Sequence, residues 1–313
     1  MKVLILGAGA VGGYFGGRLA QAGADVTFLV RPQRARKLAQ AGLVIKSPLG
    51  DAQLSVRTVL EEAVRPDYDL VILSCKAYDL DASIASIVGA VGPNTLILPL
   101  LNGMAHLARL EQVFGGARVL GGTCYIASTL DTDGSIRHLS KFQGISCGPR
   151  VGNHARASDL LRDLAQAYAR VSVECKVSAD IDQDMWEKFV LLASLAAMTC
   201  LMRASVGEIL AAEDGESLMR EALAACVMAA GAAGHAPRAE SIRQTESMLF
   251  ARGSAFTASM LRDIETGGRV EADHIIGDML RHARAAGADA RLLTAAYCHL
   301  QAYEARRRRG AAA

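Results

Sequence analysis

Six residues near the start of the chain constrain the fold more than any other part of the sequence. The run Gly7-Ala8-Gly9-Ala10-Val11-Gly12 follows an apolar stretch at 3–6 and opens a helical pattern at 12–22. In a strand–turn–helix of this kind the first glycine permits the tight turn. The second lets the backbone approach a pyrophosphate, and the third lets helix and strand pack closely. Because the helix N-terminus attracts phosphate, Gly7, Ala8, Gly9, Ala10, Val11 and Gly12 are predicted to bind a dinucleotide.

The first half of the chain alternates short β-branched runs with helical patterns. Residues 25–30, 70–74 and 95–98 are typical of strands, and 81–88 is typical of a helix. This alternation predicts a parallel sheet covered by helices. Further strands are expected at 119–128, 134–139, 144–147 and 171–175, with a turn at Asp133-Gly134 and a helix at 158–169.

The second half has a different pattern, with apolar residues every three or four positions. Helices are expected at 180–202, 216–230, 239–250 and 270–286, separated by glycine-rich breaks. The expected fold class is therefore α/β, with an N-terminal Rossmann-type dinucleotide-binding domain followed by an all-α C-terminal domain. We place these at 1–178 and 179–313.

The composition excludes several classes of protein. Lys and Arg number 34 against 32 Asp and Glu, and aromatic residues make up 5%, which argues against a nucleic-acid partner. The apolar run at 189–202 is shorter than the ~20 residues of a membrane span, so a buried helix is predicted and no membrane partner. The basic run Arg306–Arg309 is interpreted as a solvated helix end.

The cysteines and the N-terminus suggest a compartment. The 7 Cys form no C-x-x-C pair, which is typical of reduced thiols and predicts no metal site. The chain begins without a signal-peptide pattern, so a cytoplasmic location is expected. A homodimer is compatible with the long apolar helices.

The end of the second predicted strand indicates which dinucleotide binds. NAD-binding folds place an Asp or Glu there to hold the ribose hydroxyls. Here the position is Arg31, with Arg34, Arg36 and Lys37 beyond it. A guanidinium binds a 2′-phosphate through two parallel hydrogen bonds, so NADP (NADPH) is the predicted cofactor. The alternative is a solvated basic helix start.

Two polar residues follow other strands of the predicted sheet. Lys76 follows the strand at 70–74, and Asn102 follows the strand at 95–98. Ligands of open α/β sheets bind at the carboxyl ends of strands, so both are candidate ligand contacts, although each is compatible with an ordinary loop.

Several short motifs in one order resemble a known family over nearly the full chain. They are the glycine run at 7–12, Cys75-Lys76-Ala77-Tyr78, Leu101-Asn102-Gly103-Met104, Met185-Trp186-Glu187-Lys188 and Ser259-Met260-Leu261-Arg262-Asp263, with Glu271 twelve residues after Ser259. The sequence resembles ketopantoate reductase (2-dehydropantoate 2-reductase).

The resemblance implies an NADPH-dependent reduction of 2-dehydropantoate to pantoate in a cleft between the two domains. It assigns Lys188 as the catalytic lysine and Ser259 as a carboxylate-binding residue. It assigns Glu271 to catalysis and to contact with cofactor or substrate hydroxyl. Lys76 and Asn102 are implied cofactor contacts, with Asn102 also touching substrate, and the backbone near Ala127 is an implied cofactor contact.

Hydride transfer to a ketone leaves negative charge on oxygen, which a positioned ammonium stabilises and protonates. Lys188 suits that role, although a lysine that snorkels at the end of an apolar helix is the alternative.

Two positions depart from the family pattern. Residues four and eight after the lysine are usually asparagines, but here they are Leu192 and Ala196. Steps of four residues keep all three on one helix face, so that face is less polar than expected. Three interpretations remain: a reductase of ketopantoate, a related NADPH-dependent reductase of a less polar 2-oxo acid or ketone, and a non-catalytic NADP-binding sensor.

Overall fold

The computed structural model describes residues 1–150 and 154–312, which form two compact units. The first unit contains Met1–Leu101 and His106–Ile181, and the second contains Asn102–Ala105 and Asp182–Ala313. The observed division near residue 181 lies close to the predicted one at 178. The sequence did not predict that the short segment Asn102–Ala105 groups with the second unit.

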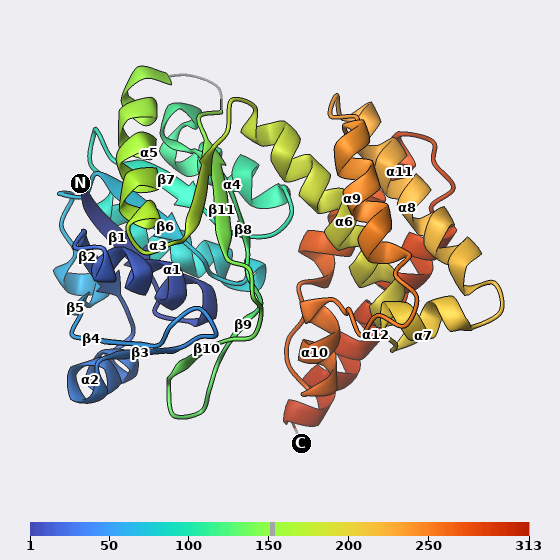
Figure 1. Cartoon of the computed structure of the whole chain (residues 1–313), viewed down its shortest axis with the longest axis horizontal. Helices are drawn as coiled ribbons and strands as arrows, with labels where there is room; N and C mark the ends of the chain where they lie inside the picture. The colour runs from blue at the N-terminus through green and yellow to red at the C-terminus, as the bar shows by residue number, and fades with distance from the viewer. Residues whose placement is uncertain (151–153, 313) are drawn as a thin grey trace. The chain divides into compact units, whose positions relative to one another are not determined.

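A five-stranded parallel sheet forms the centre of the first unit, in the order β5-β2-β1-β6-β7 (Figure 1). Its strands are β1 (Lys2–Leu6), β2 (Asp25–Leu29), β5 (Arg57–Val59), β6 (Leu70–Leu73) and β7 (Leu96–Pro99). All neighbouring strands run parallel, so their carboxyl ends lie at one edge of the sheet. The predicted Rossmann-type fold is therefore confirmed.

Helix α1 (Ala10–Gln21) lies between this sheet and a smaller one, and glycines allow the close packing on both sides. A Cβ on Gly16 would lie 2.8 Å from side-chain atoms of Ile5 and Phe28 in the parallel sheet. A Cβ on Gly17 would lie 2.7 Å from Leu43, in the small sheet. The glycine pairs of this helix are therefore a packing requirement of two layers.

The small sheet has the order β4-β3-β10-β9, and a third sheet has the order β12-β11-β8. The sequence analysis missed three of the strands and two helices. These are β3 (Leu43–Lys46), β4 (Ala52–Leu54), β5, α2 (Pro32–Ala41) and α4 (Ala105–Phe114). The missed strands are three or four residues long, so they carry too few residues for a clear alternating pattern.

Two strand predictions are corrected by the structure. The single strand expected at 119–128 is two strands, β8 (Gly121–Tyr125) and β9 (Ser128–Leu130), which belong to different sheets. The strand expected at 171–175 is β12 (Glu174–Val177), because a turn with Ser172 at φ +56° precedes it. The hairpin through Asp133-Gly134 is confirmed, since β9 pairs antiparallel with β10 (Ile136–His138).

The remaining elements of the first unit are α3 (Leu80–Ile87), β11 (Gly144–Gly148), α5 (His154–Ala169) and four short 3-10 turns. Helix α5 packs on the third sheet through β11 and β12.

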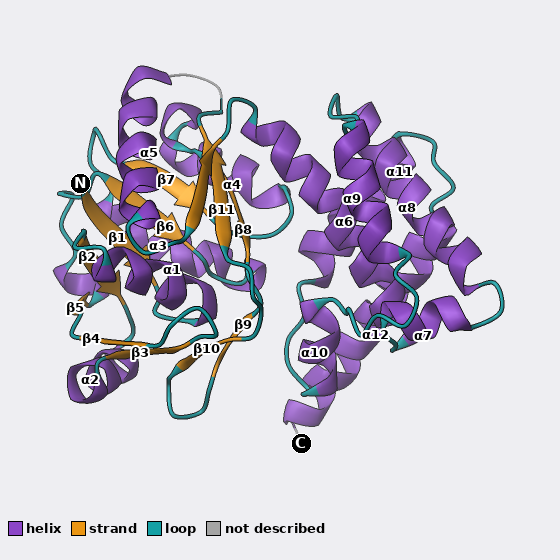
Figure 2. Ribbon diagram, in the orientation of Figure 1, coloured by secondary structure: helices purple, strands orange, loops and turns teal. Residues whose placement is uncertain are grey.

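The second unit is helical throughout its described residues, as Figure 2 shows. Its helices are α6 (Ile181–Met202), α7 (Val206–Ala211), α8 (Gly215–Ala232), α9 (Ala239–Leu249), α10 (Ser259–Glu265), α11 (Asp278–Ala285) and α12 (Arg291–Ala312). The all-α prediction is confirmed. The helix expected at 270–286 is instead a π-helical turn, Asp273–Gly277, followed by α11.

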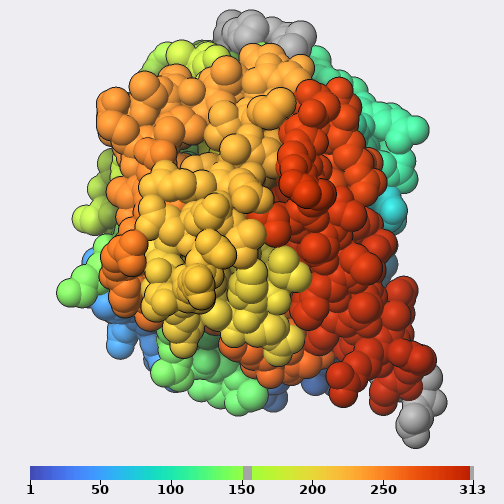
Figure 3. Space-filling view, turned by 90° about the vertical axis from the view of Figure 1, so that its right-hand side faces the viewer, coloured from blue at the N-terminus to red at the C-terminus, as the bar shows by residue number. Residues whose placement is uncertain are grey.

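Helix α6 is the core of this unit. Within the described part of the chain, this helix is long and apolar enough to cross a membrane. However, 72% of its most apolar 18-residue stretch is buried inside the protein. Such burial is typical of a core helix, as predicted for the apolar run. The last turns of α12 carry Arg306–Arg309 and project beyond the neighbouring helices (Figure 3).

Candidate functional site

The glycine-rich turn of the first unit lies between β1 and α1. Gly7 has φ +82°, a conformation that favours glycine, and its N–H donates to Leu29 O at 2.8 Å. A Cβ on Gly12 would collide with Ser74 Oγ at the end of β6 and lie 2.9 Å from Gly7 O. The tight turn and the close helix–strand packing predicted for these two glycines are both present.

Gly9 differs from these two because nothing in the described part of the chain requires it to be glycine. Its φ is −87°, which any residue adopts, and a Cβ there would meet no heavy atom within 4 Å. The missing side chain leaves open space beside the first turn of α1. Such space fits the close approach of a pyrophosphate to the backbone.

Two carbonyl oxygens of this turn accept hydrogen bonds from side chains of the protein. Arg34 donates from Nε and Nη2 to Ala8 O, at 3.1 and 2.7 Å, and Ser128 Oγ donates to Ala10 O at 3.2 Å. These oxygens would repel a phosphate if they faced it. Because Arg34 and Ser128 occupy them, the turn keeps its N–H groups as its polar character toward an anion.

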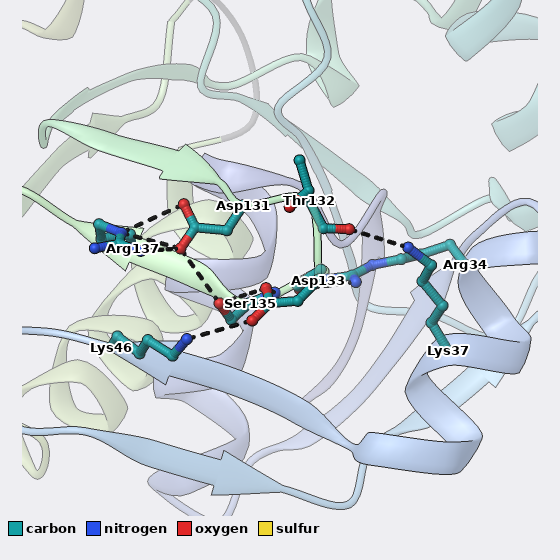
Figure 4. Close-up of polar contacts among 9 residues, drawn as sticks. Arg34, Lys37, Lys46, Asp131, Thr132, Asp133, Ser135 and Arg137 are labelled. Atoms are coloured by element: carbon teal, nitrogen blue, oxygen red, sulfur yellow. Dashed lines mark hydrogen bonds and ion pairs between the residues drawn. The ribbon is translucent and has the colours of Figure 1, made fainter.

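The basic residues after β2 divide into two groups, and Figure 4 shows the one that contains Arg34 and Lys37. Arg34 and Lys37 reach from α2 to the β9–β10 turn, where they donate to Gly134 O at 2.9 Å and Thr132 O at 3.4 Å. Arg31 and Arg36 are exposed, and no hydrogen bond or ion pair holds either side chain within the described residues. Arg31 lies two residues after the end of β2 and occupies the N-cap position of α2, where its side chain makes no capping hydrogen bond.

Two carboxylates of the β9–β10 turn make hydrogen bonds and ion pairs with neighbouring residues of the hairpin (Figure 4). Asp131 pairs with Arg137 at 2.6 Å, and Asp133 accepts from Ser135 Oγ at 2.7 Å. The pKa of Asp133 falls to about 2, chiefly because the Ser135 backbone and hydroxyl donate to it. Above that pH, Asp133 is charged in the turn that receives Arg34.

Lys76 and Ala127, the two other cofactor contacts predicted in the first unit, lie in different surroundings. Lys76 lies at the carboxyl edge of the sheet, after β6, at the start of the short 3-10 turn Ala77–Asp79. Ala127 has both backbone groups engaged, since its N–H donates to Ser140 Oγ at 3.3 Å and its carbonyl accepts from Leu139. The structure thus gives no support to Ala127 as a polar cofactor contact.

The second unit holds a polar cluster around Lys188. This lysine lies on α6 with 9% of its surface exposed, and its Nζ donates to Asn102 Oδ1 at 3.1 Å. Asn102 is half-buried and belongs to the segment Asn102–Ala105. The structure therefore brings together two residues that lie 86 positions apart in the sequence.

His274 joins this cluster and was missed by the sequence analysis. Its ring makes a hydrogen bond with the backbone of Asn102. Burial lowers the pKa of His274, although the Glu271 and Asp278 carboxylates oppose that effect, so the ring is mostly neutral near pH 7. Glu271 thus lies close enough to act on His274. The signal available in the sequence was the three-residue spacing of Glu271 and His274 at a helix start.

Ser259 occupies a separate position in the second unit. It is the exposed first residue of α10, and the preceding Ala258 N–H donates to Thr199 Oγ1 on α6 at 3.4 Å. Thr199 follows Lys188 by eleven residues, about three helical turns, so it lies on the same face of α6 about 16 Å along the axis. Leu192 and Ala196 lie on that face between them.

An ion-pair network holds α6 directly beside Lys188. Arg238 donates to Glu187 Oε2 at 2.6 Å and also pairs with Asp184, and both carboxylates are less than a tenth exposed. Burial raises the pKa of Glu187, but hydrogen bonds from Arg238 and Gln183 more than reverse this, and the pKa is lowered. Arg238 therefore ties the chain between α8 and α9 to the turn of α6 that carries the lysine.

Comparison with known proteins establishes the family. The family model described as "Ketopantoate reductase PanE/ApbA" matches residues 3–151, and the one described as "Ketopantoate reductase PanE/ApbA C terminal" matches residues 180–304. The chain belongs to the ketopantoate reductase PanE/ApbA family.

Relatives in this oxidoreductase family match almost the whole chain. The oxidoreductase YkpB of Bacillus subtilis, described as uncharacterized, is 36% identical over 309 residues, covering 97% of this chain and 99% of its own. The 2-dehydropantoate 2-reductase of Halobacterium salinarum is 27% identical over 286 residues, covering 91% and 92%.

Solved structures share the family fold. The PanE/ApbA family ketopantoate reductase of Ralstonia eutropha aligns with a TM-score of 0.87 at 25% identity, covering 98% of this chain and 100% of that one. A D-mandelate dehydrogenase in a ternary structure with NADH and anilino(oxo)acetate aligns with a TM-score of 0.86 at 20% identity, with the same coverage. This second likeness concerns the fold.

We expect Arg238→Ala to lower the free energy of unfolding by about 2 kcal/mol at pH 7, because it leaves two buried carboxylates without their cation. The folded-state pKa of Glu187 is lowered, so its stabilisation is complete above the unfolded value of about 4.3 and is lost as pH falls through the folded value. The difference between unmutated and variant proteins should therefore shrink between about pH 5 and pH 3.

Urea denaturation across that pH range measures this difference. Arg243→Ala is the matched control, since Arg243 forms an exposed pair with Glu240 on α9 and its loss should cost under about 0.5 kcal/mol at any pH. A difference for Arg238→Ala that stays constant down to pH 3 would contradict the assignment.

Proposed function

We propose that this protein is an NADPH-dependent reductase of a 2-oxo acid, nominally of 2-dehydropantoate to pantoate. The observation that carries the proposal is the buried ammonium of Lys188 held on Asn102 Oδ1. Family membership supports the reaction class, since relatives described as 2-dehydropantoate 2-reductases, from Halobacterium salinarum and Nostoc, match 91% and 99% of this chain. In the sequence, Leu100 and Leu101 separate the end of β7 from Asn102.

The residues of the second unit fit the proton-transfer step of such a reduction. NADPH supplies the hydride when bound. As the carbonyl carbon gains that hydride, the π electron pair moves to oxygen, and Lys188 Nζ donates a proton to it, which leaves an alcohol and a neutral amine. Asn102 Oδ1 holds the ammonium in place before transfer. Preorganised charge of this kind stabilises the developing oxyanion without reorganisation of solvent.

Three further residues have roles in the proposal. Glu271 is assigned to a hydroxyl of substrate or cofactor, and Ser259 to the substrate carboxylate. Lys76 is assigned to the cofactor, since it follows β6, the strand that pairs with β1. The exposed first residue of α10 presents a hydroxyl and the first N–H groups of a helix, which suit a carboxylate.

The choice of NADPH over NADH rests on Arg31. Its guanidinium is exposed directly after β2, where NAD-binding folds place a carboxylate. Arg34 is committed to the glycine-rich turn and the hairpin, which leaves Arg31 and Arg36 unengaged, and Arg31 is the one nearer the end of β2. The open space at Gly9 supports the binding of the pyrophosphate.

A second candidate substrate class is favoured by the α6 face. Leu192 is half-exposed and Ala196 is buried, on the same face as Lys188. Neither side chain can form a hydrogen bond with a substrate hydroxyl. A site lined by them therefore favours the binding of a less polar 2-oxo acid or ketone. The same NADPH-dependent chemistry would apply.

Lys188→Met should lower kcat by about a hundredfold or more with little change in dinucleotide affinity, because it keeps the stem and removes the proton donor. Steady-state NADPH oxidation and a separate binding titration measure the two quantities. Lys141→Met, at an exposed lysine between β10 and β11, is the matched control and should retain full activity. Full activity of Lys188→Met would remove this lysine from the mechanism. An unmutated protein that binds NADPH but reduces no 2-oxo acid would favour a sensor.

Arg31→Ala should weaken NADPH binding by about tenfold and leave NADH binding nearly unchanged, because only NADPH carries the 2′-phosphate. Arg36→Ala removes the same charge from an exposed position of α2 and should change neither affinity by more than about twofold. Titrations of both dinucleotides against the three proteins give the comparison. Equal affinities in the unmutated protein would refute the NADPH preference.

Trimethylpyruvate differs from 2-dehydropantoate only in lacking the hydroxyl, so the pair isolates the contribution of that group. We expect kcat/KM for trimethylpyruvate to exceed that for 2-dehydropantoate, and Leu192→Asn to shift the ratio by about tenfold toward 2-dehydropantoate. Met202→Asn, at the exposed end of α6, is the control and should leave the ratio unchanged. A wide margin in favour of 2-dehydropantoate in the unmutated protein would end the less polar alternative.

A further inference from the structure

The segment that carries His274 is a helical turn of unusual width. Residues Asp273–Gly277 form a π-helix, and α11 continues from its end. π-turns are rare in proteins and occur frequently at functional sites. The wider turn changes the direction in which the side chains of its first residues point, so the position of His274 differs from that in a regular helix.

His274 packs closely on the segment that presents Asn102. Gly103 has φ +80°, and a Cβ there would lie 3.1 Å from His274 O and 3.2 Å from His274 Cδ2. Both its backbone conformation and the lack of space therefore require glycine at 103. The ring of His274 adds a hydrogen bond to the backbone of Asn102. Two consecutive residues of the segment thus contact one histidine.

Helix α12 holds the π-turn through one tyrosine. Tyr297 OH donates to Asp273, and a Cβ on Gly277 would lie 3.0 Å from Tyr297 Cε2. Tyr297 therefore contacts the first and the last residue of the turn. This packing keeps His274 in place against Gly103.

The segment Asn102–Ala105 has little structure of its own before α4 begins at Ala105. The direction of the Asn102 side chain consequently depends on what packs against its backbone. His274 contacts the backbone of this segment, and Lys188 Nζ donates to the Asn102 side chain at 3.1 Å.

We infer that His274 is a positioning residue, which holds the Asn102–Gly103 turn so that Asn102 Oδ1 receives Lys188 Nζ. This inference deepens the proposed function, because the lysine it positions is the proposed proton donor. His274 acts through Asn102, and it is the Asn102 amide that orients the ammonium.

His274→Phe tests the inference, because phenylalanine keeps an aromatic ring of similar size and removes both ring nitrogens. Hydrogen–deuterium exchange of the peptide covering 101–105, measured by mass spectrometry on the protein without ligands, should become about tenfold faster. In the 2-oxo acid assay, kcat should fall about tenfold while KM and NADPH affinity change less than twofold. His274→Gln, which retains an N–H donor, should restore both values to within about threefold.

His235→Phe is the matched control for exchange, since His235 is a half-buried histidine of the same unit that stacks on Trp186. It should leave exchange at 101–105 unchanged. If His274→Phe does not fold, Tyr297→Phe is used instead, because it removes only the hydroxyl that donates to Asp273; it should speed exchange about threefold.

Unchanged exchange at 101–105 overturns the inference whatever the activity, and faster exchange with unchanged kcat overturns the link to Lys188. The exchange measurement needs no substrate. If the unmutated protein reduces no 2-oxo acid, the proposed function fails, while exchange alone still decides whether His274 holds the turn.

Discussion

The candidate site of the second unit depends on the cost of burying one ammonium group. Lys188 lies on the core helix α6, at the start of its apolar run, and is almost fully enclosed. Removing a charge from water costs several kcal/mol unless polar groups replace the lost solvation. The acceptor at Asn102 comes from a distant part of the chain, and the positive φ of Gly103 and the packing of His274 both serve its approach. A single buried cation thus explains several otherwise unrelated local features.

The first unit illustrates the same logic for an anion. Its glycine-rich turn has carbonyl groups as well as N–H groups, and a phosphate favours only the latter. Arg34 and Ser128 occupy the carbonyls of Ala8 and Ala10, from elements that the motif itself does not contain. The binding character of the turn therefore depends on α2 and β9 as much as on the glycines.

Much of this arrangement was predictable from local sequence. The glycine run specified the strand, turn and first helix, since Gly7 needs a positive φ and Gly12 a close contact. The division into a parallel-sheet half and a helical half followed from hydrophobic periodicity. Lys188 and Asn102 were both candidates, and the structure places them in contact.

The remaining features depend on packing between distant residues, which periodicity does not encode. The π-turn at Asp273–Gly277 has the apolar spacing of an ordinary helix, and it packs against Tyr297 and Gly103 from distant parts of the chain. Arg34 and Arg31 look equivalent in sequence, but only Arg34 is committed to the hairpin. The separate strands β8 and β9 look like one strand because the break at Ala127 carries no glycine or proline.

The grouping of Asn102–Ala105 with the second unit affects whether the two units can be separated as fragments. The chain enters that unit, leaves it and returns near residue 182, so no single cut separates two complete parts. A fragment starting at 182 would lack both the amide that receives the Lys188 ammonium and the glycine against which His274 rests. The helical unit is thus formed by two separate segments of the sequence. Inserting or deleting residues near 102 would therefore disturb a core whose main segment begins about eighty residues downstream.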